Sequence, residues 1–213
     1  MKCDKKSMLL YAVTDRTWLG EQTLAMQVEE ALRGGVTFIQ LREKKLNYDL
    51  FLEEANKMKA LCEKYQVPFV INDNVDIAKA CDADGVHIGQ SDRKVSDVRT
   101  ILGENKIIGV SAQTVEQAIT AQQEGADYLG VGAVFSTSTK LDADSVSFKT
   151  LKSICEAVNI PVIAIGGINE NNILELSGTG IDGVAVISAL FANSNIKAAA
   201  ENLCTLSKNM VKS

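Results

Sequence analysis

The sequence has very little histidine and proline: His87 is its one histidine, and Pro68 and Pro161 are its two prolines. A single histidine argues against an enzyme that relies on several metal-binding imidazoles. Each proline leads directly into an apolar run, and no proline-rich or low-complexity stretch divides the chain. We therefore expect residues 1–213 to form a single domain.

Cysteine pairs and long apolar runs are also missing. The five cysteines are odd in number and include no Cys-x-x-Cys pair: Cys3, Cys62, Cys81, Cys155 and Cys204. Buried, reduced thiols are the expected state, which suits a cytoplasmic protein. The apolar stretch at residues 8–13 is too short for a signal peptide, and no run is long enough to span a membrane. We expect a soluble intracellular protein with no membrane partner.

The chain has no excess of positive charge. Its 22 lysines and arginines face 27 aspartates and glutamates, which gives a net charge of −5 and a pI of about 5.0. This balance predicts no general attraction to nucleic acid. An anionic ligand would have to be held by a few local cations and by backbone dipoles.

Eight short apolar, β-rich runs alternate with longer helical patterns. The runs are residues 9–13, 38–41, 69–71, 85–88, 107–110, 128–131, 162–165 and 184–187. In residues 46–65, for example, apolar side chains recur at helical spacing. Eight such units predict an α/β fold, a single (β/α)8 TIM barrel. An open doubly wound sheet is the alternative, but no Gly-x-Gly-x-x-Gly follows the first run.

A similar phrase recurs just before four of the runs, at residues 34–37, 83–86, 125–128 and 180–183. A glycine or another small residue ends the helix, and a polar residue leads into the next strand. Four copies of one βα unit favour a barrel over an open sheet.

The carboxyl end of the second predicted strand carries Gln40, Arg42 and Lys44. Ligands of such barrels bind at the carboxyl ends of the strands, and period-two alternation directs these three side chains to one side. An amide and two cations that converge in an acidic protein indicate an anion site. A solvated loop with chance charges is the alternative interpretation.

The next two strands end in Asn72-Asp73 and in a turn that contains Asp92. Two carboxylates at neighbouring strand ends suit Mg²⁺, which binds one or two carboxylates together with substrate phosphate oxygens. Helix capping is the alternative role for each of them.

Three single residues carry weaker signals. His87 lies within a predicted strand, so a packed, hydrogen-bonded role is favoured over that of a catalytic base. Ser111 follows the fifth strand and could donate a hydrogen bond to a ligand. Trp18, in a predicted loop, could stack on one.

A second anion site is predicted near the last strands. Gly166-Gly167 follows the seventh strand, and Ser188 opens a short segment after the eighth. Glycine lets the backbone approach a ligand closely, and loops after strands seven and eight often bind phosphate in these barrels. We interpret Gly167 in this way: a side chain there would stand between backbone and phosphate. The hydroxyl-rich connection 132–140 could fold over the mouth, or be only a flexible polar loop.

These residues together resemble the thiamine-phosphate synthase family from residue 11 to about residue 200. The matching motifs are Q-x-R-x-K at 40–44, N-D at 72–73, D-G-[VI]-H-[IVL]-G-Q-x-D at 84–92, G-V-S at 109–111, T-x-T-K at 137–140, I-G-G-I at 165–168 and [IV]-S-A at 187–189. The chain departs from the family at Ala133 and Ser136, where the family usually has prolines that would stiffen the loop.

The resemblance implies a transferase that joins a pyrimidinylmethyl diphosphate to a thiazole phosphate and releases pyrophosphate. It implies a pyrimidine diphosphate site formed by Gln40, Arg42, Lys44, Asn72, Ser111 and Lys140. It implies Mg²⁺ on Asp73 and Asp92. It implies a thiazole phosphate site formed by Thr137, Ser138, Thr139, Gly167, Ile187 and Ser188. Arg42, Lys44, Ser111 and Lys140 would act on the leaving group.

The implied reaction breaks the bond to pyrophosphate, leaves a pyrimidinylmethyl cation and lets the thiazole nitrogen attack it. Such chemistry needs charge neutralisation and positioning more than a strong base. Three rivals are a thiazole tautomerase-like isomerase on the same barrel, a phosphosugar isomerase or decarboxylase, and a non-catalytic ligand-binding barrel. The sequence leaves open the oligomeric state, a homo-oligomer included, the number of Mg²⁺ ions, and whether the acceptor carries a carboxylate.

Overall fold

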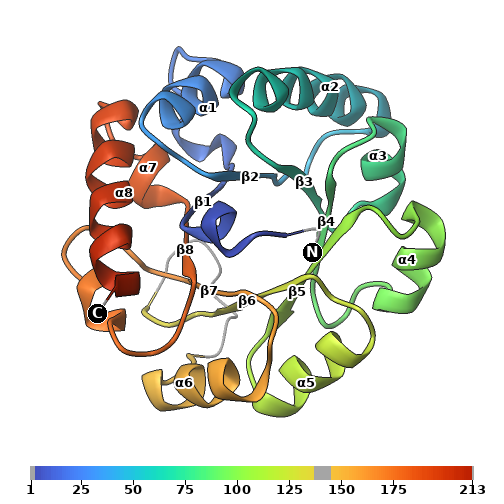
Figure 1. The fold of residues 1–213 in the computed structure, drawn as a ribbon. Helices are drawn as coiled ribbons and strands as arrows, with labels where there is room; N and C mark the ends of the chain where they lie inside the picture. The colour runs from blue at the N-terminus through green and yellow to red at the C-terminus, as the bar shows by residue number, and fades with distance from the viewer. Residues whose placement is uncertain (1–2, 137–144, 213) are drawn as a thin grey trace.

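A closed barrel of eight parallel strands forms the centre of this computed structural model, which describes residues 3–136 and 145–212 (Figure 1). The strands are β1 (Leu10–Val13), β2 (Phe38–Leu41), β3 (Phe69–Asn72), β4 (Gly85–Ile88), β5 (Ile107–Ala112), β6 (Tyr128–Gly132), β7 (Val162–Ile165) and β8 (Gly183–Val186). Each strand pairs with the next, and β8 pairs with β1. The predicted TIM barrel is therefore confirmed, and the open sheet is excluded.

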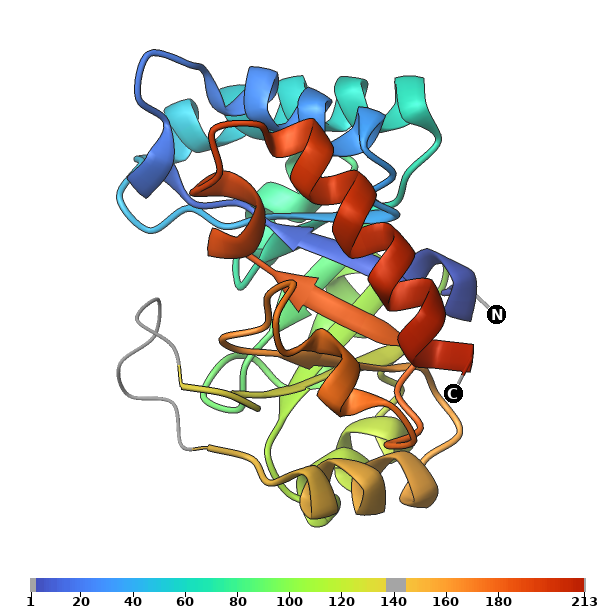
Figure 2. The same ribbon diagram turned by 90° about the vertical axis from the view of Figure 1, so that its left-hand side faces the viewer.

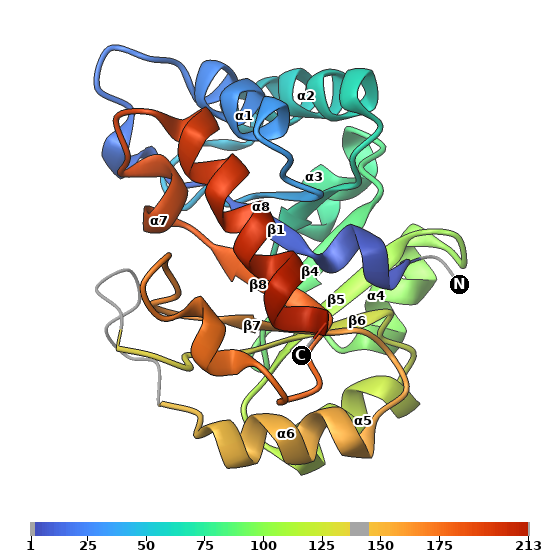
Figure 3. The same cartoon turned by 60° about the vertical axis from the view of Figure 1, so that its left-hand side comes forward.

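Helices surround the barrel as an outer layer (Figures 1 and 2). They are α1 (Leu24–Arg33), α2 (Tyr48–Tyr65), α3 (Val75–Ala80), α4 (Val95–Leu102), α5 (Val115–Gln123), α6 (Phe148–Ala157), α7 (Ser188–Phe191) and α8 (Ile196–Lys212). Short 3-10 turns occur at η1 (Lys5–Met8), η2 (Arg16–Trp18) and η3 (Ile173–Leu176), the last in the place of a helix after β7. Figure 3 shows α8 beside α1 and across β1 and β8. None of these helices is both long and apolar enough to cross a bilayer.

The phrase that recurs in the sequence has one structural role at all four places. The polar residue before each even-numbered strand accepts a hydrogen bond from a backbone N–H at the start of the preceding strand, and donates its own N–H to the same residue's carbonyl. The side-chain bonds are Thr37 to Leu10 (2.9 Å), Asp84 to Phe69 (2.8 Å), Asp127 to Ile108 (2.8 Å) and Asp182 to Val162 (3.0 Å). These bonds fix strand register at the amino end of the barrel, opposite the predicted site.

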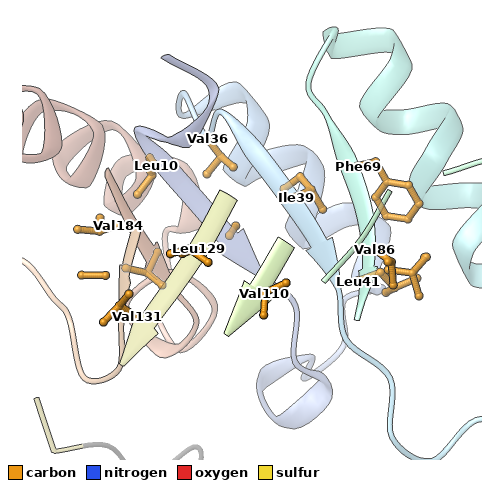
Figure 4. Close-up of a cluster of buried hydrophobic side chains, with 14 of the residues drawn as sticks. Leu10, Val36, Ile39, Leu41, Phe69, Val86, Val110, Leu129, Val131 and Val184 are labelled. Atoms are coloured by element: carbon orange, nitrogen blue, oxygen red, sulfur yellow. The ribbon is translucent and has the colours of Figure 1, made fainter. Parts of the chain in front are cut away.

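Two hydrophobic cores stabilise the barrel. The larger one lies between strands and helices; Figure 4 shows Leu10, Ile39, Phe69, Leu129 and Val184 from it. The smaller one fills the barrel interior with Cys3, Met8, Tyr11, Val13, Phe38, Val70, Ile107, Tyr128, Ile163 and Ala185. Because Cys3 and Met8 belong to it, the N-terminal segment closes the amino end of the barrel, as its place over the opening in Figure 1 shows.

The five cysteines are free, and all but Cys155 are buried. Burial raises the pKa of the Cys3 and Cys62 thiols to about 12. Both therefore stay protonated and unreactive at neutral pH, in agreement with the predicted reduced thiols.

Candidate active site

Lys44, Asn72 and Asp73 form one hydrogen-bonded group at the carboxyl ends of β2 and β3. The Lys44 ammonium lies 2.6 Å from one Asp73 carboxylate oxygen, and the Asn72 amide donates to the other at 2.8 Å. The three residues border an open hollow of about 420 Å³, which is also lined by Arg93. Polar groups predicted from two separate strands thus meet at one place.

The backbone holds Asp73 in a left-handed conformation, with φ of 60°. This conformation is uncommon for a residue with a side chain, and such strain gathers at functional sites. The Asp73 N–H donates to the His87 carbonyl oxygen at 2.8 Å, which ties the end of β3 to β4. Asp73 is therefore positioned by its backbone as well as by Lys44.

Asp92 lies in the turn after β4, where its carboxylate accepts the Gly89 N–H at 2.6 Å. Within residues 3–136 and 145–212, no group of three or more His, Cys, Asp and Glu side chains is arranged to hold a metal ion. Mg²⁺, however, needs only one or two carboxylates when substrate phosphates supply further oxygens. Asp73 and Asp92, from neighbouring strand ends, are donors of this chemistry.

The two predicted cations contact different partners. One Arg42 guanidinium nitrogen lies 3.2 Å from an Asp15 carboxylate oxygen, and the Arg42 N–H donates to the Thr14 hydroxyl at 3.0 Å. Lys44 instead contacts Asp73. The side chains of Arg42 and Lys44 are therefore each neutralised by a carboxylate rather than gathered as one free cationic cluster, and an anionic ligand would have to compete for them.

Sequence reasoning missed the residue between these cations, Glu43. Its carboxylate is almost completely buried and forms an ion pair of 2.6 Å with Arg16, which also contacts Glu54 of α2 at 2.9 Å. Burial raises the pKa of Glu43, although the ion pair with Arg16 opposes this shift. Arg16 thus anchors the β2–α2 loop. The sequence signal for the separate role of Glu43 was the period-two alternation, which directs residue 43 away from residues 42 and 44.

Gln40 and Ser111 face the barrel interior and are joined there by buried polar side chains. Gln40 Nε2 donates to the Tyr11 hydroxyl at 2.7 Å, and Ser111 Oγ lies 3.0 Å from His87 Nε2. The predicted packed role of His87 is confirmed, because both of its ring nitrogens are hydrogen-bonded. Burial lowers the pKa of His87 to about 4, and the nearby Asp92 charge opposes this only in part. His87 is therefore neutral at pH 7.

Tyr11 and Tyr128, which complete this interior group, were also missed. Their hydroxyls lie 2.7 Å apart, and burial raises the pKa of both phenols. Gly109 makes room for Tyr128, because a Cβ at this position would overlap the tyrosine ring. In the sequence both tyrosines lie in apolar strand runs, and nothing there indicates that their hydroxyls are hydrogen-bonded.

The structure shows what a side chain at position 167 would meet. Its φ is 65°, and a Cβ there would overlap the Ser136 carbonyl oxygen and contact Phe135. Gly166 has the same relation to Ala133, and its carbonyl accepts the Phe135 N–H at 3.1 Å. A side chain at 167 would therefore press into the described start of the β6–α6 loop. The contact between the Gly167 backbone and a phosphate stays a prediction. Glycine is required here because two loops pack closely.

Ile187 and Ser188 lie at the carboxyl end of β8. The Ile187 side chain packs against the interior core, and Ser188 borders a hollow of about 210 Å³ together with Asn169 and Asn193. Asn169 and Asn172 both donate side-chain hydrogen bonds to the Gly167 carbonyl oxygen, at 3.2 and 2.9 Å. The Gly167 segment is thus held firmly beside this hollow.

Four predicted site residues, Thr137, Ser138, Thr139 and Lys140, lie outside the described part of the chain. Trp18, predicted to lie in a loop, ends the 3-10 turn η2, and its side chain packs against the larger core.

Comparison with known proteins gives one consistent family. Residues 10–190 match the family model described as thiamine monophosphate synthase. The thiamine-phosphate synthase of Clostridium tetani is 54% identical over 194 residues, 91% of this chain and 93% of that protein. The enzyme of the same name from Ruminiclostridium cellulolyticum is 52% identical over 200 residues, 94% of this chain and 95% of its own length.

A solved structure shows the same arrangement. The thiamine phosphate pyrophosphorylase from Pyrococcus furiosus superimposes with a TM-score of 0.90 at 39% identity, over 97% of this chain and 98% of that one. The similarity therefore covers the whole barrel.

Proposed function

Because this chain belongs to the thiamine monophosphate synthase family and is a transferase that forms thiamine phosphate, we propose that its reaction takes place at the carboxyl end of the barrel. There, 4-amino-2-methyl-5-pyrimidinylmethyl diphosphate would react with a thiazole phosphate, and pyrophosphate would leave. The observation that carries this placement is the Lys44–Asn72–Asp73 group, which borders an open hollow large enough for a diphosphate. Residues 1–213 would form a single domain around this site.

The leaving group would be bound on the β2–β3 side of the mouth. Arg42 and Lys44 are the described cations predicted to contact the diphosphate, with Lys140 as the third predicted cation. Asp73 and Asp92 would hold Mg²⁺, which neutralises charge on the departing pyrophosphate. In the structure Arg42 forms an ion pair with Asp15, and Lys44 forms one with Asp73. Substrate binding would therefore exchange carboxylate partners for phosphate oxygens.

The acceptor would be bound on the β7–β8 side. Its phosphate is predicted to contact Gly167 and Ser188, next to the hollow of about 210 Å³, and Ile187 would contact the thiazole. Thr137, Ser138 and Thr139 belong to the same predicted site. Backbone N–H groups and hydroxyls suit a monophosphate in a protein with net negative charge.

The chemistry follows from the groups that the mouth offers. The bond between the pyrimidinylmethyl carbon and the diphosphate oxygen breaks, the electron pair leaves with pyrophosphate, and the thiazole nitrogen forms the new C–N bond. This sequence needs no strong base, and His87 has both nitrogens occupied by Tyr128 and Ser111. Cations and hydrogen-bond donors aimed at the leaving group supply the stabilisation.

The rivals fit less well. A thiazole tautomerase would have no use for the Lys44–Asp73 group, and the named relatives are synthases. One assay separates the readings: purified protein with both substrates and Mg²⁺, followed for thiamine phosphate and pyrophosphate. Formation of both products at equal rates is expected. Isomerisation of a thiazole substrate without pyrophosphate release would support the tautomerase, and absence of any turnover would support the non-catalytic barrel.

A further inference from the structure

Five polar side chains form an unbroken row of hydrogen bonds across the barrel interior. The row runs from Gln40 to Tyr11 (2.7 Å), Tyr128 (2.7 Å), His87 (2.9 Å) and Ser111 (3.0 Å), and its members come from β2, β1, β6, β4 and β5. Tyr11 and Tyr128 are at most 1% exposed. The row therefore lies under the mouth and joins two predicted substrate-binding residues that are far apart in sequence.

Each hydrogen bond in the row needs one proton. Because the Gln40 amide can only donate to Tyr11, it determines which atom is the donor in every following bond. The Tyr11 hydroxyl accepts from Gln40 Nε2, so its own proton goes to the Tyr128 oxygen. Tyr128 then donates to His87 Nδ1. His87 keeps its proton on Nε2 and donates it to Ser111 Oγ. Every buried hydroxyl in this order has one donor and one acceptor.

We propose that the row has one direction, from Gln40 to Ser111, and that it fixes the Ser111 hydroxyl as a hydrogen-bond donor to the diphosphate substrate. Tyr11, Tyr128 and His87 are then positioning residues. They contact no substrate. Tyr11 and Tyr128 fix the proton of His87 on Nε2, and His87 donates it to the Ser111 oxygen, so that the Ser111 proton points into the mouth. The role toward the diphosphate rests on the proposed function, whereas the direction of the row does not.

A protonated His87 does not fit this row. It would donate to Tyr128 as well as to Ser111, and the Tyr128 proton would then point to Tyr11, which already accepts from Gln40. The buried Tyr11 proton would have no acceptor within the row, which costs free energy. Burial, which lowers the pKa of His87 to about 4, favours the same neutral ring.

The functional consequence lies at the leaving group. Negative charge develops on the departing pyrophosphate, and a donor that is oriented in advance stabilises it without reorganisation. A serine free to rotate would instead spend part of its time donating to His87. The row removes that competing bond.

The direction can be measured in the ligand-free protein, because the chain has one histidine. In untagged protein labelled with [15N]histidine, the imidazole NMR signals belong to His87 alone. We expect an unprotonated Nδ1 and a protonated Nε2 at pH 7. A protonated Nδ1, or a doubly protonated ring, would overturn the proposal.

Tyr128→Phe tests the link to catalysis. The variant removes the hydroxyl that donates to Nδ1, so we expect the Nδ1 signal to move to that of a nitrogen without a hydrogen bond. We also expect kcat to fall about tenfold, the scale of one hydrogen bond, while KM for the thiazole phosphate stays unchanged. An unchanged Nδ1 signal, or a shifted signal with unchanged kcat, would contradict the proposal.

Tyr65→Phe is the matched control. It removes the hydroxyl that donates to Glu29 on the outer helices, and should leave the His87 signals and kcat as they are. If Tyr128→Phe fails to fold, Ser111→Ala serves instead: Nε2–H then loses its acceptor, and Nδ1 must remain unprotonated. Protonation of Nδ1 in this variant would overturn the direction. A wild type with the expected tautomer but no synthase turnover would refute the proposed function alone.

Discussion

The neutral, buried His87 predicts a specific loss of stability in mild acid. The ordinary pKa of a histidine is 6.5, and in the folded protein burial lowers that of His87 to about 4. The unfolded chain therefore binds a proton at a pH where the folded protein does not. Stability is fully present above pH 6.5 and falls between pH 6.5 and 4.

The magnitude follows from these two values. One unit of pKa difference corresponds to about 1.4 kcal/mol, so the full contribution of His87 is about 3 kcal/mol. Integrated over pH, the loss is about 1 kcal/mol at pH 6 and about 2 kcal/mol at pH 5. His87 is the only histidine, and the carboxylates that titrate in the lower part of this window, Glu43 among them, are present in both the wild type and a His87 variant, so the difference between the two proteins isolates one side chain.

The assay is urea unfolding of the wild type and of His87→Gln between pH 7.5 and 4.5, both with chelator so that no metal alters the charge near Asp92. The variant lacks the row of hydrogen bonds and is less stable at pH 7.5. The difference between the two proteins should shrink by about 2 kcal/mol when the pH falls to 5. Parallel stability curves for the two proteins would refute the burial argument.

Three further predictions concern the mouth of the barrel. Asp73→Ala should lower turnover by about a hundredfold while Asp76→Ala, in the same hollow, does not; full wild-type activity in excess chelator would contradict the metal proposal. Arg42→Lys should raise KM for the diphosphate and leave KM for the thiazole phosphate nearly unchanged, because lysine lacks the planar fork; equal damage to both would indicate misfolding. Gly178→Ala, at positive φ in open space, should lower Tm by about 5 °C, and Gly167→Ala, which adds an overlap with Ser136, should lower it clearly more; equal Tm values would refute the close packing of the loops.

The barrel could be predicted from the sequence because its signals are local. Each strand is a short apolar run, and the observed strand ends differ from the predicted ones by at most two residues, as at Ala112 of β5. The recurring polar residue before strands was visible as a pattern. Its role was not, because the bonds of Asp84 and Asp127 go to residues 15 and 19 positions away.

The partners of the site residues could not be predicted. The sequence indicates that Arg42 and Lys44 follow the same strand, but the ion pairs with Asp15 and Asp73 depend on which loops meet above the barrel. The hydrogen-bond partners of Tyr11 and Tyr128 could not be predicted for the same reason. An apolar strand pattern says that a side chain is buried, but not that its hydroxyl has a partner 117 positions away.

The glycines show most clearly that a residue type in the sequence does not reveal the structural reason for which it is required. Gly109 and Gly167 both lack a side chain because something else occupies the space: the Tyr128 ring in one case and the Ser136 carbonyl in the other. At Gly109 the neighbour is a member of the interior row, so a larger residue would displace a positioning side chain. At Gly167 the neighbour is backbone of the β6–α6 loop, the same loop that carries the predicted Thr137 to Lys140 site. A substitution at 167 would therefore displace the backbone at Ser136, so acceptor affinity and Tm should be measured on the same variant: a fall in affinity without a fall in Tm would indicate a contact between Gly167 and the phosphate.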